Sequence, residues 1–99
     1  MTDIIQNLQQ DSSKHMYQKH GISYLGLFGS IARGEDTIDS DVDLLIDFNE
    51  PKSLFDLADV KIYFQDILGR KVDLAMKGKL KKILEPYIRK DLITIYEKN

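Results

Sequence analysis

Two aspartates spaced two residues apart are the first residues of this sequence that could do chemistry. Asp41 and Asp43 flank Val42, and an apolar run follows them. Alternate side chains of a β-strand point to the same side, so the two carboxylates would lie close enough to share a cation. Without a cation the two charges repel, and the pKa of at least one would rise. The spacing predicts a divalent metal site of oxygen ligands, which Mg²⁺ or Mn²⁺ prefer more than zinc does.

A third aspartate interrupts another short apolar run. Asp73 lies between Val72 and Leu74, and it can lie beside Asp43 if the two runs are neighbouring strands. Three carboxylates would then define a two-metal site, in which one ion holds a triphosphate and the other activates an attacking hydroxyl. Asp73 would be a ligand or the general base of an in-line displacement at the α-phosphorus, with pyrophosphate leaving. The alternatives are that Asp41 and Asp43 lie at a frayed strand start in solvent, and that Asp73 is an exposed residue at the edge of the sheet.

A glycine-serine pair closes an apolar, β-prone run and could bind phosphate. Gly29 permits close backbone approach, and Ser30 could cap a first helical turn with its hydroxyl group. Amide groups at such a turn hold phosphate oxygens, and the guanidinium of Arg33 could make a second phosphate contact. The alternative is an ordinary turn between a strand and a helix.

The elements that must position these residues follow from the apolar pattern. We expect a first helix that ends at His20-Gly21 and a helical turn at residues 30–33. Strands are expected at residues 22–28, 42–48 and 71–76, with the second covered on both faces. Residues 54–68 carry an apolar stripe at helical spacing after a capping box from Ser53 to Asp56.

The C-terminal part is less regular. Residues 80–88 predict a final amphipathic helix, which the ring of Pro86 should end or kink near Leu84 or Glu85. The segment 92–97 fits an edge strand or a helical tail equally well. The order of elements predicts an α/β or α+β fold, with a mixed sheet of three or four strands and flanking helices.

The composition is that of one ordinary folded domain, residues 1–99. Of the 99 residues, 42% are apolar and 30% are charged, and the modest core would gain from a homodimer or another partner. Because the chain has no cysteine, a metal must be bound by carboxylates or imidazoles. The N-terminus is polar, and no apolar run approaches the roughly 20 residues of a membrane span. We therefore expect a cytoplasmic protein with no membrane contact.

The charges are segregated along the chain. A formal net charge of −2 does not favour a general nucleic-acid-binding protein. Residues 35–50 carry seven acids and no cation, whereas residues 77–90 carry six cations and one acid. Metal-nucleotide chemistry would use both segments, but two solvated faces of opposite sign are the alternative.

Together these motifs resemble the DNA polymerase β-like nucleotidyltransferase superfamily, and more narrowly its minimal nucleotidyltransferase (MNT) family. The resemblance covers essentially the whole chain and implies the polymerase β-like core fold. It is carried by the Gly29-Ser30 pair, ten further residues, Asp41-x-Asp43 and the later Asp73. The longer motifs are residues 27–35, LFGSIARGE; residues 40–46, SDVDLLI; and residues 68–74, LGRKVDL.

The resemblance implies a role for each site residue. Catalysis and metal binding fall to Asp41, Asp43 and Asp73, and nucleotide binding to Gly29, Ser30, Arg33 and Ser40. It also implies ATP as the substrate and two Mg²⁺ ions as cofactors, with Mn²⁺ as an alternative.

The family also implies a partner. Many MNT proteins are antitoxins that silence a HEPN-domain ribonuclease toxin by transferring AMP from ATP to a toxin tyrosine. We therefore expect a Mg²⁺-dependent protein adenylyltransferase that acts on a HEPN toxin, with which it could form a hetero-oligomer. An antitoxin that only binds its toxin is an open alternative, as is nucleotidyl transfer to a small molecule or to RNA.

Overall fold

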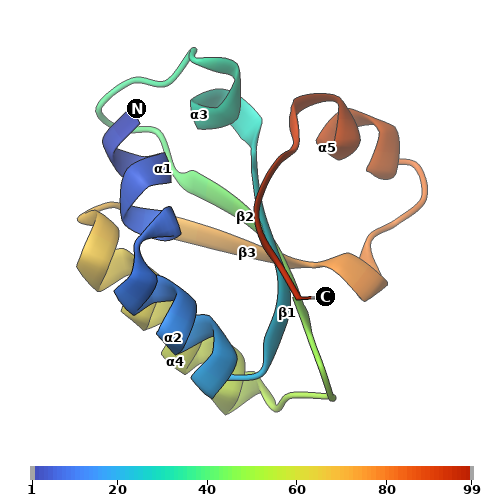
Figure 1. The fold of residues 1–99 in the computed structure, drawn as a ribbon. Helices are drawn as coiled ribbons and strands as arrows, with labels where there is room; N and C mark the ends of the chain where they lie inside the picture. Colours follow the sequence, from blue (N-terminus) through green and yellow to red (C-terminus); the bar gives the residue numbers. More distant parts are fainter. Residues whose placement is uncertain (1, 99) are drawn as a thin grey trace.

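A four-stranded mixed sheet forms the centre of the fold (Figure 1). The structure is a computed structural model that describes residues 2–98. The strand order is β3-β2-β1-β4, and the strands are β1 (Ile22–Phe28), β2 (Val42–Phe48), β3 (Val72–Met76) and β4 (Ile93–Glu97). β1 pairs antiparallel with β2 and β4, whereas β2 and β3 are parallel. The predicted mixed α/β fold is confirmed, and the segment left open at residues 92–97 contains a strand.

Three helices pack on one face of the sheet: α1 (Thr2–Gln9), α2 (Asp11–Lys19) and α4 (Leu54–Leu68). The rings of Tyr17 in α2 and Phe64 in α4 lie 6.0 Å apart, and both side chains are fully buried. The short helix α3 (Gly29–Arg33) follows β1 directly, and α5 (Glu85–Asp91) lies between β3 and β4 in sequence. Figure 1 shows α5 well separated from α2 and α4.

The core lies between the sheet and these three helices. Its buried residues are Ile4, Leu8, Tyr17, Ile22, Leu25, Leu27, Ile31, Val42, Leu44, Ile46, Phe48, Val60, Phe64, Val72 and Ile95. On β2 the core takes Leu44 and Ile46, and since side chains alternate along a strand, Asp43 and Leu45 point to the opposite face. The candidate catalytic residue Asp43 is therefore on the face of the sheet that these helices leave open.

Helix α4 makes the crossover between the two parallel strands that carry Asp43 and Asp73. It begins with the predicted capping box, in which the Ser53 hydroxyl accepts from the Asp56 amide at 3.2 Å and the Asp56 carboxylate accepts from the Ser53 amide at 3.1 Å. It ends at Gly69, whose φ of 65° suits a helix C-cap. This crossover brings β3 back beside β2 and thereby places the third aspartate.

The N-terminal segment differs from the single helix that its apolar spacing predicts. The helix is interrupted between α1 and α2 at Gln10, which has extended backbone angles. The buried side chains of Leu8 and Ser13 are five residues apart. Because residues three or four apart share one face of a continuous helix, the interruption at Gln10 allows both side chains to face the core. The Ser13 hydroxyl donates to the Asn7 carbonyl at 2.8 Å and binds an acceptor at the end of α1.

The position of Pro86 also differs from the prediction, which was wrong here. Residues 77–79 form a 3₁₀ turn, and Pro86 stands in the first turn of α5, so it begins a helix that it was expected to end. Proline suits this place because an amide in the first turn has no partner within the helix. The helix is consequently displaced toward the C-terminus and ends at Asp91.

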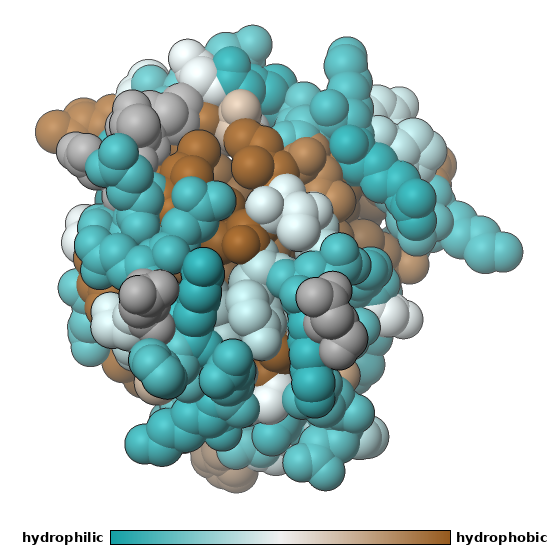
Figure 2. All heavy atoms as spheres, in the orientation of Figure 1, coloured by the Kyte–Doolittle hydropathy of each residue, from teal (hydrophilic) through white to brown (hydrophobic). Residues whose placement is uncertain are grey.

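The surface of the face drawn in Figure 2 is mostly hydrophilic. Apolar side chains gather in its middle, in the region where α1, α3 and β4 come together (Figures 1 and 2). Among residues 2–98, no helix combines the length and the apolar character needed to cross a bilayer.

Candidate active site

Two of the three predicted acids are neighbours at one end of the β2–β3 pair, and the charge of the third, Asp41, also reaches Asp43. Asp43 and Asp73 are direct register partners on these parallel strands, and adjacent strands lie about 4.8 Å apart. Asp41 immediately precedes β2. Asp41 and Asp43 are half-buried, whereas Asp73 is exposed on the edge strand. The structure therefore brings together Asp43 and Asp73, which are 30 residues apart in the sequence.

The electrostatics of Asp43 reflect this crowding. Burial raises the pKa of the Asp43 carboxyl, and the nearby charges of Asp73 and Asp41 raise it further, while Arg33 opposes them. Desolvation and like charges both disfavour the ionised form, and a bound cation would remove the repulsion. Asp43 is thus the central member of the acidic group.

Gly29 lies against the carboxylate of Asp43. Its φ is +80°, and a Cβ atom built at this position would collide with the carboxyl group of Asp43. A side chain is therefore excluded at residue 29 by both backbone conformation and space. The turn that follows β1 can approach the acids closely only because glycine stands there.

The predicted serine cap is absent from this turn. α3 begins at Gly29, its N-cap is Phe28, and no side-chain hydrogen bond caps it. Ser30 is instead the half-buried second residue of the helix, and its carbonyl accepts from the Glu35 amide at 2.9 Å. Its hydroxyl is therefore not committed to the predicted capping bond. Phosphate binding by Gly29 and Ser30 stays a prediction.

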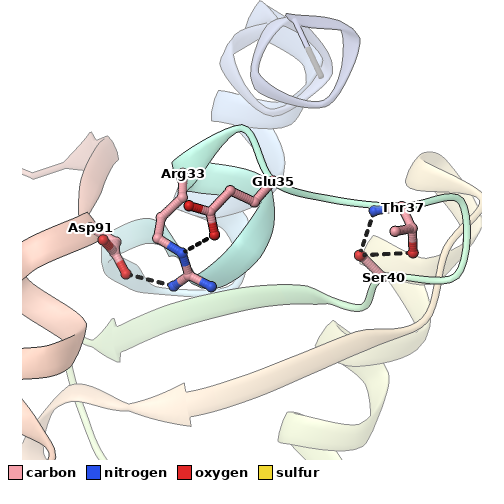
Figure 3. A network of polar contacts seen from close by, with 5 residues as sticks. All are labelled: Arg33, Glu35, Thr37, Ser40 and Asp91. Atoms are coloured by element: carbon pink, nitrogen blue, oxygen red, sulfur yellow. Dashed lines mark hydrogen bonds and ion pairs between the residues drawn. The ribbon is translucent and has the colours of Figure 1, made fainter.

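Arg33 leaves the far end of α3 and pairs with two carboxylates (Figure 3). Its Nη1 donates to Asp91 Oδ2 at 2.8 Å, and its Nε donates to Glu35 Oε2 at 3.0 Å. These hydrogen bonds raise the pKa of Arg33, with Asp91 as the larger cause. A guanidinium has five N–H donors, so three remain for a phosphate. The contact with Asp91 ties α3 to the end of α5.

Ser40 stabilises the loop before β2. Its hydroxyl accepts from the Thr37 amide at 2.8 Å (Figure 3). The Ser40 amide donates to the Thr37 carbonyl at 3.1 Å. This pair of bonds shapes the turn that leads into Asp41. A direct nucleotide contact of Ser40 stays a prediction.

Arg70 is a positioning residue for which the sequence analysis gave no role. Its Nη1 donates to the carbonyls of Thr37 and Ser40 at 3.2 and 3.3 Å, and its Nη2 lies 3.5 Å from Asp36 Oδ2. It joins the start of β3 to the loop that ends at Asp41. The only signal in the sequence was its place two residues before Val72 in the quoted motif.

The acid set fits a hard divalent cation. All three side chains are carboxylates, the ligands that Mg²⁺ and Mn²⁺ prefer, and burial together with the charges of Asp73 and Asp41 raises the pKa of Asp43. Within residues 2–98 there is no group of three or more histidine, aspartate or glutamate side chains that could hold a metal ion. Mg²⁺ usually completes its shell with substrate phosphates and water, so an incomplete protein ligand set suits it.

The chain matches known proteins over most of its length. A family model described as Nucleotidyltransferase domain matches residues 11–97. Protein adenylyltransferase MntA from Thermococcus cleftensis is 34% identical over 91 residues, which cover 92% of this chain and 92% of the relative.

Solved structures share the fold. A structure named as a candidate minimal nucleotidyltransferase has 34% identity and a TM-score of 0.71, over 84% of this chain and 85% of its own. A chain from the complex of tri-AMPylated Shewanella oneidensis HEPN toxin with MNT antitoxin has a TM-score of 0.67 at 14% identity, over 94% and 73% of the two chains. The second likeness concerns the fold alone.

The family model and the MntA relative cover the site residues together with the elements that position them. The predicted resemblance is therefore confirmed, and the chain belongs to the nucleotidyltransferase family, as a relative of the minimal nucleotidyltransferases.

Proposed function

We propose that this protein transfers AMP from ATP to a tyrosine hydroxyl of a HEPN-domain toxin and acts as the antitoxin of that toxin, with Mg²⁺ as its metal. The observation that carries the proposal is the pairing of Asp43 with Asp73 beside the Gly29 turn. A metal-bound triphosphate requires carboxylates that bind the metal and a backbone turn that lies close to them.

The comparisons support the acceptor class. The Thermococcus cleftensis relative is named a protein adenylyltransferase, and the Shewanella oneidensis complex contains a HEPN toxin that carries AMP groups. A HEPN toxin is therefore the acceptor that we assign to this chain. The expected assembly is a hetero-oligomer of the two proteins.

The reaction is an in-line displacement at the α-phosphorus of ATP. The acceptor oxygen forms a bond to this phosphorus, the bond to the bridging oxygen of the β-phosphate breaks, and pyrophosphate leaves. The proton of the hydroxyl group passes to the carboxylate of Asp73, which is the most exposed of the three acids. Gly29, Ser30 and Arg33 hold the departing phosphates.

The metal would be held by Asp41, Asp43 and Asp73 together with phosphate oxygens. A divalent ion at this place supplies Lewis-acid stabilisation of the charge that develops on the phosphate oxygens. The protein contributes the placement of the donors, through the β2–β3 register and the loop that Arg70 stabilises.

The test is AMP transfer to the purified toxin partner. The protein is incubated with Mg²⁺, α-labelled ATP and the HEPN protein, and mass spectrometry locates any adduct. Asp43→Asn should reduce transfer by at least about 100-fold, the loss typical of removing one electrostatic group at a reacting centre. Asp39→Asn, an exposed acid of the same loop, is the matched control and should transfer AMP normally.

Two results would decide whether the protein transfers AMP to the toxin or only binds it. An AMP-sized mass increase on a toxin tyrosine, absent with Asp43→Asn, supports the proposal. If the two proteins bind tightly but no nucleoside triphosphate gives an adduct, the protein is a binding antitoxin and the catalytic proposal is wrong.

A further inference from the structure

A hollow lies between α4 and β3, beside Asp73. It has a volume of about 310 Å³, and its walls include Leu57 of α4, Leu74 of β3 and Asp73 itself. It is separate from the cavity under α5, which Tyr24 and Ile88 line. Since β3 is the edge strand of the sheet, no further strand within residues 2–98 covers the hollow. A partner can therefore reach it from the side.

The hollow has a polar end and an apolar end. Helix α4 runs back from the end of β2 to the start of β3, so its first residue, Leu54, lies toward Met76, and the later Lys61 lies toward Asp73. Asp73 and Met76 are three residues apart, which is about 10 Å along a strand. A carboxylate and an ammonium group thus lie at one end, and apolar side chains line the rest.

The two charged groups at the polar end are not paired with each other. Within residues 2–98 all ion pairs of 4.0 Å or less have an arginine as the cation, and none includes Asp73. Lys61 is half-buried and Asp73 is exposed. An ammonium group donates hydrogen bonds and a carboxylate accepts them, so a hydroxyl group between the two can make both contacts.

A tyrosine side chain matches this arrangement. Its ring is apolar and its tip is polar, so the ring can pack on Leu57 and Leu74 while the hydroxyl group reaches the polar end. The sulfur of Met76 can make a further favourable contact with an aromatic ring. A serine or threonine would leave the apolar part of the hollow empty. The hydroxyl group of a tyrosine in this place lies next to Asp73, to which the proposed reaction passes its proton.

Two exposed apolar side chains stand at the apolar end. Leu54 is 83% exposed and Phe55 is 85% exposed, and both belong to the first turn of α4. The capping box between Ser53 and Asp56 fixes this turn, so the two side chains are presented on an ordered backbone. Apolar side chains that cluster on the surface within a polar rim are typical of a contact with another protein.

From these observations we infer that the hollow between α4 and β3 receives the acceptor tyrosine of the partner protein, and that Leu54 and Phe55 contact the residues around this tyrosine. The inference rests on the proposed function, because it takes Asp73 to accept the proton of the acceptor hydroxyl group. The partner then approaches over the edge of the sheet, at β3.

The first experiment fills the hollow from its exposed side. Ala58 is an exposed residue of α4 that lines the hollow, so Ala58→Trp places a large ring in it. This variant should raise the KM for the HEPN protein at least about tenfold and change kcat little, because it removes binding and not chemistry. ATP binding, measured by calorimetry with Mg²⁺, should be unchanged. Asp59→Trp is the matched control, since it places the same ring at the next exposed residue, outside the hollow.

Two results with Ala58→Trp would overturn the inference. One is a folded variant whose KM for the HEPN protein is that of the wild type. The other is weaker binding of ATP with a normal KM for the HEPN protein, which would assign the hollow to the nucleotide.

The second experiment measures the contact directly, so it decides the question even if Ala58→Trp does not fold. Phe55 is replaced by the photo-crosslinker benzoylphenylalanine, and irradiation with the HEPN protein should join residue 55 to a segment that contains a tyrosine. The same replacement of Ile83, which is 75% exposed and lies before α5, is the control and should not join that segment. If residue 55 joins only a second copy of this chain, another part of the HEPN protein or nothing, the inference is wrong.

The two proposals fail separately. If AMP reaches a toxin tyrosine but Ala58→Trp has a normal KM, the acceptor enters from another side and the proposed function stands. If residue 55 joins a tyrosine segment of the HEPN protein but no AMP is transferred, the docking surface stands and the proposed function is wrong.

Discussion

Arg33 is held at the edge of the site by a residue 58 positions later in the chain. Its partner Asp91 has a side chain that is only 13% exposed, whereas Arg33 itself is 41% exposed. A carboxylate in a fixed position can orient a guanidinium and leave its other donors free for phosphate. If Arg33 contacts phosphate as proposed, Asp91 is a positioning residue for that contact.

We predict that Asp91→Asn raises the KM for ATP several-fold and changes kcat and the melting temperature little. The binding of phosphate weakens because Arg33 loses the partner that orients it, but folding changes little because the guanidinium of Arg33 is 41% exposed and solvent screens the pair. Steady-state kinetics and thermal unfolding measure the two effects. Asp59→Asn, an equal change of charge at an exposed position of α4, should alter neither. An unchanged KM would show that Asp91 does not orient Arg33 for ATP, and a lower KM would mean that Asp91 competes with phosphate for Arg33.

The chemistry of single residues could be predicted further than their contacts. The spacing of Asp41 and Asp43 and the apolar run around Asp73 predicted an acidic group, and the structure places Asp43 beside Asp73. That these acids bind metal stays a prediction. The pairing of Arg33 with Asp91 depends on where α5 lies. Pattern within one segment carries no information about such a long-range contact, so it could not be predicted.

At the scale of elements, the loop between α3 and β2 determines the position of Asp41. Arg70 donates to two carbonyls of this loop, those of Thr37 and Ser40. We predict that Arg70→Ala lowers kcat up to about 100-fold, because small displacements of a reacting group are that costly. The melting temperature should change little. Enzyme kinetics and thermal unfolding are the measurements.

Two further variants make the Arg70 prediction specific. Lys71→Ala removes an exposed neighbouring cation and should be active. Arg70→Lys should not restore activity, because an ammonium group lacks the second nitrogen with which Arg70 reaches Asp36 while its Nη1 donates to both carbonyls. Full activity of Arg70→Ala would show that the loop holds Asp41 without it.

The start of α4 gives a prediction about pH. The amide and hydroxyl of Ser53 donate to Asp56, and these hydrogen bonds lower its pKa. Because the pKa of Asp56 is lower in the folded state, its ionised carboxylate stabilises the fold at pH values above its ordinary pKa of about 3.9. This stabilisation is lost as the pH falls through the lowered pKa. Asp56→Asn should therefore lower the melting temperature at pH 7 and make no difference in strong acid. Asp66→Asn, an exposed acid later in the helix, is the control, and an equal loss at both pH values would contradict the prediction.

Local sequence patterns predicted some helices and strands correctly and others incorrectly. Strands 22–28 and 42–48 and the helix at 54–68 follow from local apolar spacing and a capping box, so the sequence was sufficient. Pro86 was misplaced because the ring permits two outcomes, the end of one helix or the first turn of another, and only packing decides between them. The break at Gln10 was missed because Leu8 and Ser13 are buried five residues apart, and a buried serine has no apolar signature.

At the scale of the whole molecule, the two faces of the sheet have different roles. One face packs on α1, α2 and α4 and contains the core, and the other carries the acids and the cavity under α5. Because β2 contributes alternate side chains to both faces, stability and chemistry are encoded in interleaved residues of the same strand. Substitutions in the core of the helical face should therefore change stability and leave activity intact, and substitutions on the opposite face should do the reverse.

Phe64 provides the sharpest test of this separation. Its side chain is fully buried between α4 and the sheet, 6.0 Å from the ring of Tyr17. Phe64→Ala should cost about 3–5 kcal/mol, a large part of the roughly 5–15 kcal/mol that stabilises a domain, and should lower the melting temperature by more than about 12 °C. Transfer activity per folded molecule, measured in the cold, should stay near that of the wild type. Ile62→Ala, at a 54% exposed position of the same helix, should change neither quantity much. A lower kcat in the folded fraction of Phe64→Ala would show instead that packing on the helical face determines how Asp43 and Asp73 are placed.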